Sequence, residues 1–281
     1  MTPKSLAWFA FAAFSLQMGA AQDFKKSYPA TPGQIWIDTI SGNIKILGYK
    51  GQDIEIIAYK KGSDSSSIEI QEEVKDGSMG KWVFLRARFP QLNPGKLPPG
   101  GFEPGKVPPE PGRFGRGPFG PGKIDTGNDS VDFEIRVPKQ DKIENKLVVH
   151  TVNGNVEAAN LFWNIDAATD IGVVDLKDVR GNVTARSRGI GSIKVDLGAH
   201  KESSEMHFFS MNGSVTVKAP GNLDAHVFMS SDSGQLQTDF PVKVQDNRYG
   251  RKRTAEGTLG SGQRQTIHII SMWGSVSFLK K

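Results

Sequence analysis

Short runs in which apolar and polar residues alternate recur along most of the chain. The clearest are Lys81–Arg88 and Val131–Pro138, and shorter runs lie at 35–37, 44–46, 53–58 and 68–70. Alternation of this kind predicts half-buried strands, and no apolar residues recur at helical spacing beyond the N-terminus. The 32 Gly and 16 Pro among 281 residues are too many for a helical protein. The pattern therefore predicts an all-β chain.

A short motif repeats through these runs: a turn residue, a glycine, an asparagine or serine, and then an apolar–polar–apolar triplet. Glycine lacks a Cβ, so the chain can turn sharply at each copy, and we expect the Asn or Ser to bond to local backbone. A spacing of about ten residues, with about twenty as a double unit, predicts stacked repeats. The copies assign these structural turn glycines: Gly42, Gly154, Gly172, Gly181, Gly191, Gly213, Gly234 and Gly274.

Two architectures bury the apolar face of such a repeat. One is a β-solenoid resembling a single-stranded β-helix, and the other is an antiparallel meander or sandwich with Gly–Asn hairpin turns. Similar copies at regular spacing favour the solenoid, because equivalent corners then lie above one another. The roughly 160 residues after position 123 would then form about seven or eight coils of about twenty residues.

The chain divides into four segments by composition. Residues 1–21 have the pattern of a signal peptide, with Lys4 before a short apolar run and small residues at 19–21. Residues 22–90 form the N-terminal β-strand part of the repeat domain, and 124–281 form the β-repeat, adhesin-like domain. Between them, 91–123 is a proline- and glycine-rich insertion that we expect to be disordered. We expect one domain interrupted by a long loop.

The net charge of +5 does not predict nucleic-acid binding. The insertion holds five basic residues against two acidic ones, so most of the excess lies outside the predicted fold. A nucleic-acid reader would carry a basic face on its ordered part. No stretch after the signal peptide could cross a membrane as a helix, so we expect no transmembrane segment in the mature chain. The predicted location is the periplasm, the outer surface or the medium.

The chain offers little catalytic chemistry. It has no cysteine, which excludes disulfides and thiolate sites. The five histidines, His150, His200, His207, His226 and His268, show no metal-binding spacing. We therefore predict no catalytic, cofactor-binding or metal residues, no cofactor and no enzyme activity. The enzyme alternative is a β-helix-type polysaccharide lyase or hydrolase using the local cluster Asp166, Asp170, Asp175 and Asp178, and the same aspartates are the candidate calcium ligands.

Several stretches resemble one known family. They are 132–139, Thr151–Val156, the successive Gly-Asn or Gly-Ser copies, and the close at 257–262, 266–271 and 273–276. Together they resemble the bacterial adhesin-like β-strand-repeat family DUF4097 over most of residues 124–281. The resemblance implies an exported β-repeat protein without catalytic residues. The insertion, and Trp273 and Arg180 at turn positions, depart from the family pattern.

These observations predict a non-enzymatic, exported cell-envelope protein, an adhesin or scaffold that binds through a β-repeat surface. Its partner would be a cell-surface or envelope macromolecule. End-to-end self-association is a corollary, because a repeat rod ends in strand edges. A third interpretation is an envelope regulatory protein that engages its partner through the insertion.

Overall fold

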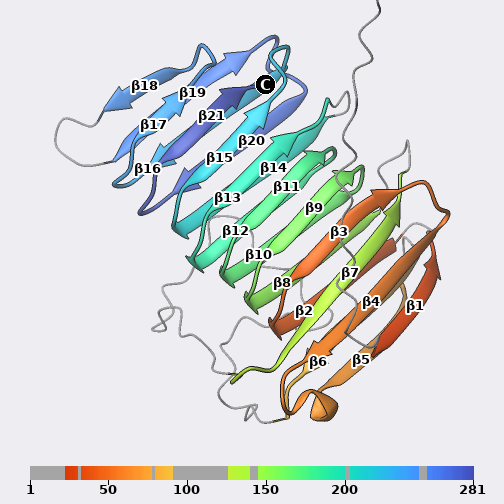
Figure 1. Ribbon diagram of the computed structural model, residues 1–281. Coiled ribbons are helices and arrows are strands. Elements are labelled where there is room, and N and C mark those ends of the chain that lie inside the picture. The colour runs from red at the N-terminus through yellow and green to blue at the C-terminus, as the bar shows by residue number, and fades with distance from the viewer. Residues whose placement is uncertain are drawn as a thin grey trace, which may run out of the picture.

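Most of the described residues of the protein lie in β-strands (Figure 1). The computed structural model describes residues 23–30, 33–77, 80–90, 126–139, 145–199, 203–246 and 252–281. These contain strands β1 to β21 and one short 3₁₀ turn, η1 (Ser65–Ser67), with no α-helix among them. The expected all-β fold is confirmed.

The strands form two large sheets that face each other. The ten strands of sheet A run in the order β1 (Phe24–Pro29), β4 (Asp53–Lys61), β7 (Ser130–Pro138), β3 (Ile44–Tyr49), β9 (Val156–Leu161), β11 (Val174–Val179), β13 (Ile193–Leu197), β15 (Val215–Ala219), β21 (Val276–Lys280) and β17 (Leu236–Thr238). The eleven strands of sheet B run in the order β18 (Lys243–Asp246), β19 (Arg253–Leu259), β16 (Ala225–Ser231), β20 (Gln265–Ser271), β14 (Ser204–Asn212), β12 (Val183–Ile190), β10 (Asn164–Ile171), β8 (Lys146–Asn153), β2 (Gly33–Ser41), β6 (Gly80–Arg88) and β5 (Glu69–Gly77).

The chain alternates between the sheets and so forms stacked coils. Strands β8, β10, β12 and β14 pair in parallel in sheet B, and β9, β11, β13 and β15 do the same in sheet A. A hairpin meander would make neighbouring strands antiparallel. Parallel pairing therefore confirms the solenoid and excludes the meander for these coils.

The core lies between the sheets and is filled by alternate residues of each strand. In β7, for example, Val131, Phe133, Ile135 and Val137 are at most 1% exposed. The intervening residues face outward, as the period of two along a strand requires. Trp163 is buried in this core, where its indole Nε1 donates a hydrogen bond of 3.0 Å to the Pro138 carbonyl.

One corner of the solenoid is a column of glycines. A Cβ on Gly191 would lie 1.6 Å from the carbonyl oxygen of Gly172, and one on Gly213 would lie 2.1 Å from that of Gly191. The next coil therefore passes through the space that a side chain would fill. The column runs through Gly42, Gly154, Gly172, Gly191, Gly213, Gly274 and Gly234. Gly181 instead lies between β11 and β12 with φ 111°, so the ten-residue unit is half a coil.

Hydroxyl groups line the inside of this corner. Thr151 donates a 2.8 Å hydrogen bond to the carbonyl of Gly42, Thr169 donates one of 2.8 Å to Gly154, and Ser271 one of 2.8 Å to Gly213. Ser210 and Ser231 make the same bond to the glycine of the neighbouring coil. Five carbonyls of the corner are thus hydrogen-bonded, those of Gly42, Gly154, Gly191, Gly213 and Gly274.

The asparagines beside the glycines also connect coils. The side-chain oxygen of Asn43 accepts a 2.9 Å hydrogen bond from the Asn155 amide, and that of Asn155 accepts one of 2.8 Å from Val173. The expectation that these residues bond to their own turn is wrong at these two positions. An in-register stack brings the next coil's amide within reach, so each asparagine bonds across the stack.

The coils do not stack in chain order at the C-terminal end. The last coil, β20–β21, lies between β14–β15 and β16–β17 (Figure 1). Six two-strand coils follow the insertion in the described residues, fewer than the seven or eight predicted, because β18 and β19 add as antiparallel strands. At the other end β4 and β5 are antiparallel to β7 and β6.

Strands from both sides of the insertion belong to the same two sheets. Strand β2 pairs with β8 in sheet B, and β3 pairs with β7 in sheet A. The predicted signal peptide at 1–21 and the insertion at 91–123 lie outside the described residues. The proposed segment boundaries therefore stay predictions.

Candidate functional site

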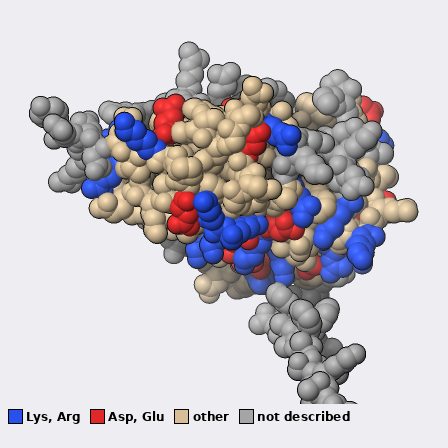
Figure 2. All heavy atoms as spheres, turned by 90° about the horizontal axis from the view of Figure 1, so that it is seen from above, with Lys and Arg blue, Asp and Glu red and all other residues tan. Residues whose placement is uncertain are grey.

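The outer faces of the two sheets carry different side chains. Outward residues of sheet A are mostly charged and of mixed sign: Lys45, Glu134, Glu157, Asp175, Lys177, Lys194, Asp196 and Lys218. Figure 2 shows basic and acidic side chains interspersed on one face of the molecule. The outer face of sheet B instead carries aromatic rings, histidines and enclosed ion pairs. This face holds the candidate site.

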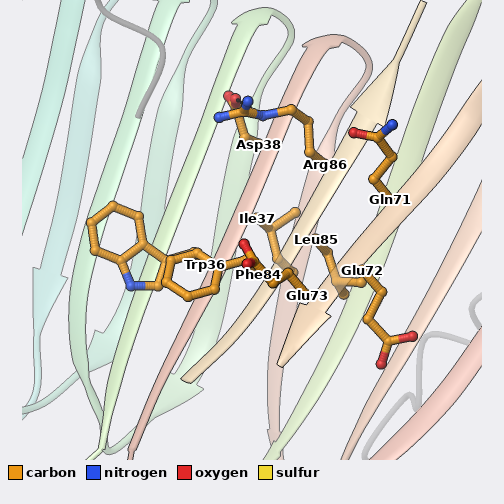
Figure 3. Close-up of a pocket in the computed structure, with 9 residues that line it drawn as sticks. All are labelled: Trp36, Ile37, Asp38, Gln71, Glu72, Glu73, Phe84, Leu85 and Arg86. Atoms are coloured by element: carbon orange, nitrogen blue, oxygen red, sulfur yellow. Dashed lines mark hydrogen bonds and ion pairs between the residues drawn. The ribbon is translucent and has the colours of Figure 1, made fainter. Parts of the chain in front are cut away.

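The N-terminal end of that face has a hollow of about 520 Å³ between β2, β5 and β6 (Figure 3). The rings of Trp36 and Phe84 lie 5.7 Å apart in its wall, with their planes 35° apart. Trp82 meets Phe84 edge-on at 6.3 Å, and the Lys75 ammonium lies 5.7 Å from the Phe84 ring centre. Register explains the group, because Trp36 and Phe84 are paired on adjacent strands.

Polar side chains line the same hollow. The Arg86 guanidinium donates a 3.1 Å hydrogen bond to the Asp38 carboxylate, and both residues line the hollow together with Gln71 and Glu73. Burial alone would raise the pKa of Asp38. Its hydrogen bond with His150 and the positive charges of His150 and Arg86 outweigh burial and lower that pKa, so Asp38 is ionised.

A buried histidine continues this network onto the neighbouring strands. His150 is 2% exposed, and its Nδ1 lies 2.9 Å from an Asp38 oxygen while its Nε2 lies 3.6 Å from Asp170. Arg188 contacts the His150 ring and donates a 2.7 Å hydrogen bond to Asp170. Burial and the charge of Arg188 lower the pKa of His150, but its contacts with the Asp170 and Asp38 carboxylates prevail and raise that pKa.

This network holds its ring and carboxylates in fixed positions. The pKa of Asp170 is also lowered: burial alone would raise it, and His150 and Arg188 outweigh burial. A glycosidase needs a carboxyl group whose pKa is raised, so that the group still holds a proton to donate at neutral pH. Asp38 and Asp170 are shifted in the opposite direction, and each is committed to basic partners.

The four aspartates of the predicted cluster do not converge. Asp166 and Asp170 lie on β10 in sheet B, where they pair with Arg186 and Arg188. Asp175 and Asp178 lie on β11 in sheet A, and each has a basic partner of its own, Lys177 or Arg180. The corner at Gly172 sends the two halves to opposite faces, so the group forms neither an acid–base pair nor a calcium site.

The structure brings together two histidines that the sequence analysis treated separately. His207 on β14 and His268 on β20 are paired in register, and their rings stack at 5.0 Å with planes 15° apart. Glu205 lies beside them, with an oxygen 2.9 Å from His207 Nε2. Burial lowers the pKa of His268, and the charges of His207 and His226 lower it further.

A sequence signal for this pairing exists. His207 and His268 each lie three residues before the serine that bonds to the corner, Ser210 and Ser271. Aligning the coils on that serine places the histidines at the same position.

The eight predicted turn glycines contribute backbone turns and no functional side chain. His200 lies outside the described residues.

No helix among the described residues is long and apolar enough to cross a membrane. The fold defines a class, a two-sheet parallel β-solenoid with antiparallel strands at its ends.

No protein-family model and no curated protein matches the chain. The likeness to the DUF4097 family therefore stays a prediction.

A solved structure with a similar fold comes from Clostridium sporogenes, where the protein is provisionally named a cell adhesion protein. The similarity covers 92% of this chain and 99% of that chain, with a TM-score of 0.50 and 13% sequence identity. At this identity the likeness concerns the fold alone.

Proposed function

We propose that the protein is a non-enzymatic, exported cell-envelope protein that works as an adhesin or scaffold. The outer face of sheet B at β2, β5 and β6 is its binding surface. The observation that carries the proposal is the aromatic hollow, where two neighbouring rings adjoin a bonded carboxylate and guanidinium. Apolar walls with a few fixed polar groups are typical of ligand sites.

The ligand we propose is a surface polysaccharide. Ring faces offer flat apolar area for the carbon–hydrogen faces of sugars, while Asp38, Arg86, Gln71 and Glu73 offer partners for hydroxyl groups. The provisional name of the structural neighbour agrees with a role in adhesion. Residues 91–123 and end-to-end association remain further candidate routes to a partner.

Glycan-array binding with matched variants tests this proposal. Phe84→Ala removes one wall of the hollow and is expected to weaken binding at least about tenfold, the loss that about 1.4 kcal/mol produces. Phe228→Ala, on β16 at the far end of the same face, is the control and should bind like the wild type.

Two outcomes would contradict the proposal: the wild type retains no glycan, or both variants lose binding equally. Incubation with acidic polysaccharides tests the enzyme alternative. We expect no new reducing ends and no unsaturated products.

A further inference from the structure

Two imidazole rings and a carboxylate meet on the outer face of sheet B, far from the aromatic hollow. Strands β14 and β20 are neighbours in sheet B (Figure 1). They pair in parallel, so His207 and His268 lie directly opposite each other. Glu205 precedes His207 by two residues on β14 and therefore points to the same face. One ligand atom from each of the three lies within 4.8 Å of the other two.

These distances are close to those of a bound metal ion. Imidazole nitrogens lie about 2.0–2.1 Å from Zn²⁺, so neighbouring ligand atoms around a tetrahedral ion are about 3.3 Å apart. Small rotations of the side chains can close the remaining distance. The Glu205 side chain, 66% exposed, already contacts His207, and His207 retains 20% exposure, so an ion can reach the group from solvent.

We propose that Glu205, His207 and His268 form a surface site for one divalent transition-metal ion of the Zn²⁺, Cu²⁺ or Ni²⁺ type. Two imidazoles and one carboxylate suit these borderline ions better than Mg²⁺ or Ca²⁺, which prefer all-oxygen shells. The site keeps coordination positions open toward solvent, where water or a group of a partner molecule completes the shell.

The neighbouring strand supports the site from its other side. Phe228 on β16 lies opposite His268, with ring centres 5.9 Å apart, and restricts the imidazole. His226 on the same strand lies one row away, where its Nε2 is 3.2 Å from Glu256. His226 is thus engaged elsewhere, which leaves a three-residue site as the unit to test.

Zn²⁺ titration of the untagged full chain, after treatment with a chelator, tests the proposal. Calorimetry should show one ion per chain, and Zn²⁺ should raise the melting temperature of the wild type. His207→Gln and His268→Gln each remove one ligand while keeping a planar side chain. Each should weaken Zn²⁺ binding by more than about tenfold, the smallest loss expected from removing even an outer-shell partner. Glu256→Gln is the matched control and should bind Zn²⁺ as the wild type does.

Cu²⁺ provides a readout that does not depend on how the variants fold. The electron paramagnetic resonance spectrum of the Cu²⁺-loaded wild type should show coupling to two imidazole nitrogens. The proposal is overturned if the wild type binds no Zn²⁺ saturably or its Cu²⁺ signal lacks nitrogen coupling. It is also overturned if Glu256→Gln weakens binding as much as His207→Gln does.

Discussion

Replacing Gly191 with alanine tests the glycine column at its tightest point. The new Cβ would lie 1.6 Å from the Gly172 carbonyl oxygen, whereas carbon and oxygen in van der Waals contact are more than 3 Å apart. Coils are held about 4.8 Å apart by backbone hydrogen bonds, so neither coil can withdraw without breaking some of them. The two at risk are Gly172 N to Ile190 O at 3.0 Å and Gly191 N to Asn212 O at 3.2 Å.

The size of the effect follows from these contacts. Two lost backbone hydrogen bonds contribute about 1 kcal/mol each, and overpacking a well-filled site adds about 1–3 kcal/mol. Gly191→Ala should therefore lower the free energy of unfolding by about 3–5 kcal/mol. For a chain of this size that corresponds to a melting temperature lower by about 6–20 °C.

Urea denaturation followed by circular dichroism measures this difference. Gly221→Ala is the matched control, because nothing lies within 4 Å of a Cβ at Gly221. It should change stability by less than about 0.5 kcal/mol. If Gly191→Ala were as stable as Gly221→Ala, the coils could not be stacked with glycine against glycine.

Other predictions concern the hydroxyl row and the buried histidine. Ser210→Ala removes the 2.9 Å hydrogen bond to the Gly191 carbonyl and should cost about 1–3 kcal/mol in urea denaturation, while an unchanged midpoint would contradict that role. His150→Ala removes the buried ring that bonds to Asp38, while Arg86 and Arg188 still pair with the two carboxylates, and it should cost about 1.5–3 kcal/mol by the same assay; an unchanged midpoint would refute it. The raised pKa of His150 stabilises the fold fully below about pH 6.5, and this contribution is lost as the pH rises through the folded-state pKa. The lowered pKa values of Asp38 and Asp170 stabilise the fold above about pH 4, and this contribution is lost as the pH falls through theirs. The difference between wild type and His150→Gln should therefore be largest near pH 5, and a pH-independent difference would contradict the network.

The repeat motif predicts the local geometry well. The Gly-Asn and Gly-Ser copies other than that at Gly181 mark a close passage of neighbouring coils, and parallel stacking follows from the similarity of the copies. A signal in the same motif was overlooked. A hydroxyl residue stands three positions before most column glycines, as Thr151 does before Gly154 and Ser271 before Gly274. In five coils that hydroxyl bonds to the glycine of the neighbouring coil, and it is absent before Gly181, which lies outside the column. Gly191 is the exception, because Arg188 stands three positions before it.

The order of the coils could not be predicted from the motif. Every corner has the same form, so the sequence does not specify which coil lies against which. The terminal strands β20 and β21 insert between coils that are consecutive in the chain. The stacked histidines were missed for that reason, since His207 and His268 are neighbours only in this arrangement. The aspartates near Gly172 are close along the chain but not in space, because the corner at Gly172 places them on two different sheets.

The most direct test of the account is a disulfide between β15 and β21, which are neighbours only if the last coil is inserted out of chain order. The chain has no cysteine of its own, so two introduced cysteines can pair only with each other. Thr216 and Ser277 are paired in register on the outer face of sheet A, within the span that a disulfide bridges. The double variant Thr216→Cys/Ser277→Cys should oxidise to an intramolecular disulfide in the folded protein, visible as a shift in non-reducing electrophoresis. Thr216→Cys/Gln237→Cys should stay reduced, because β21 separates those strands by about 10 Å. The reverse result would place β15 against β17 in chain order and contradict both the fold and the paired histidines.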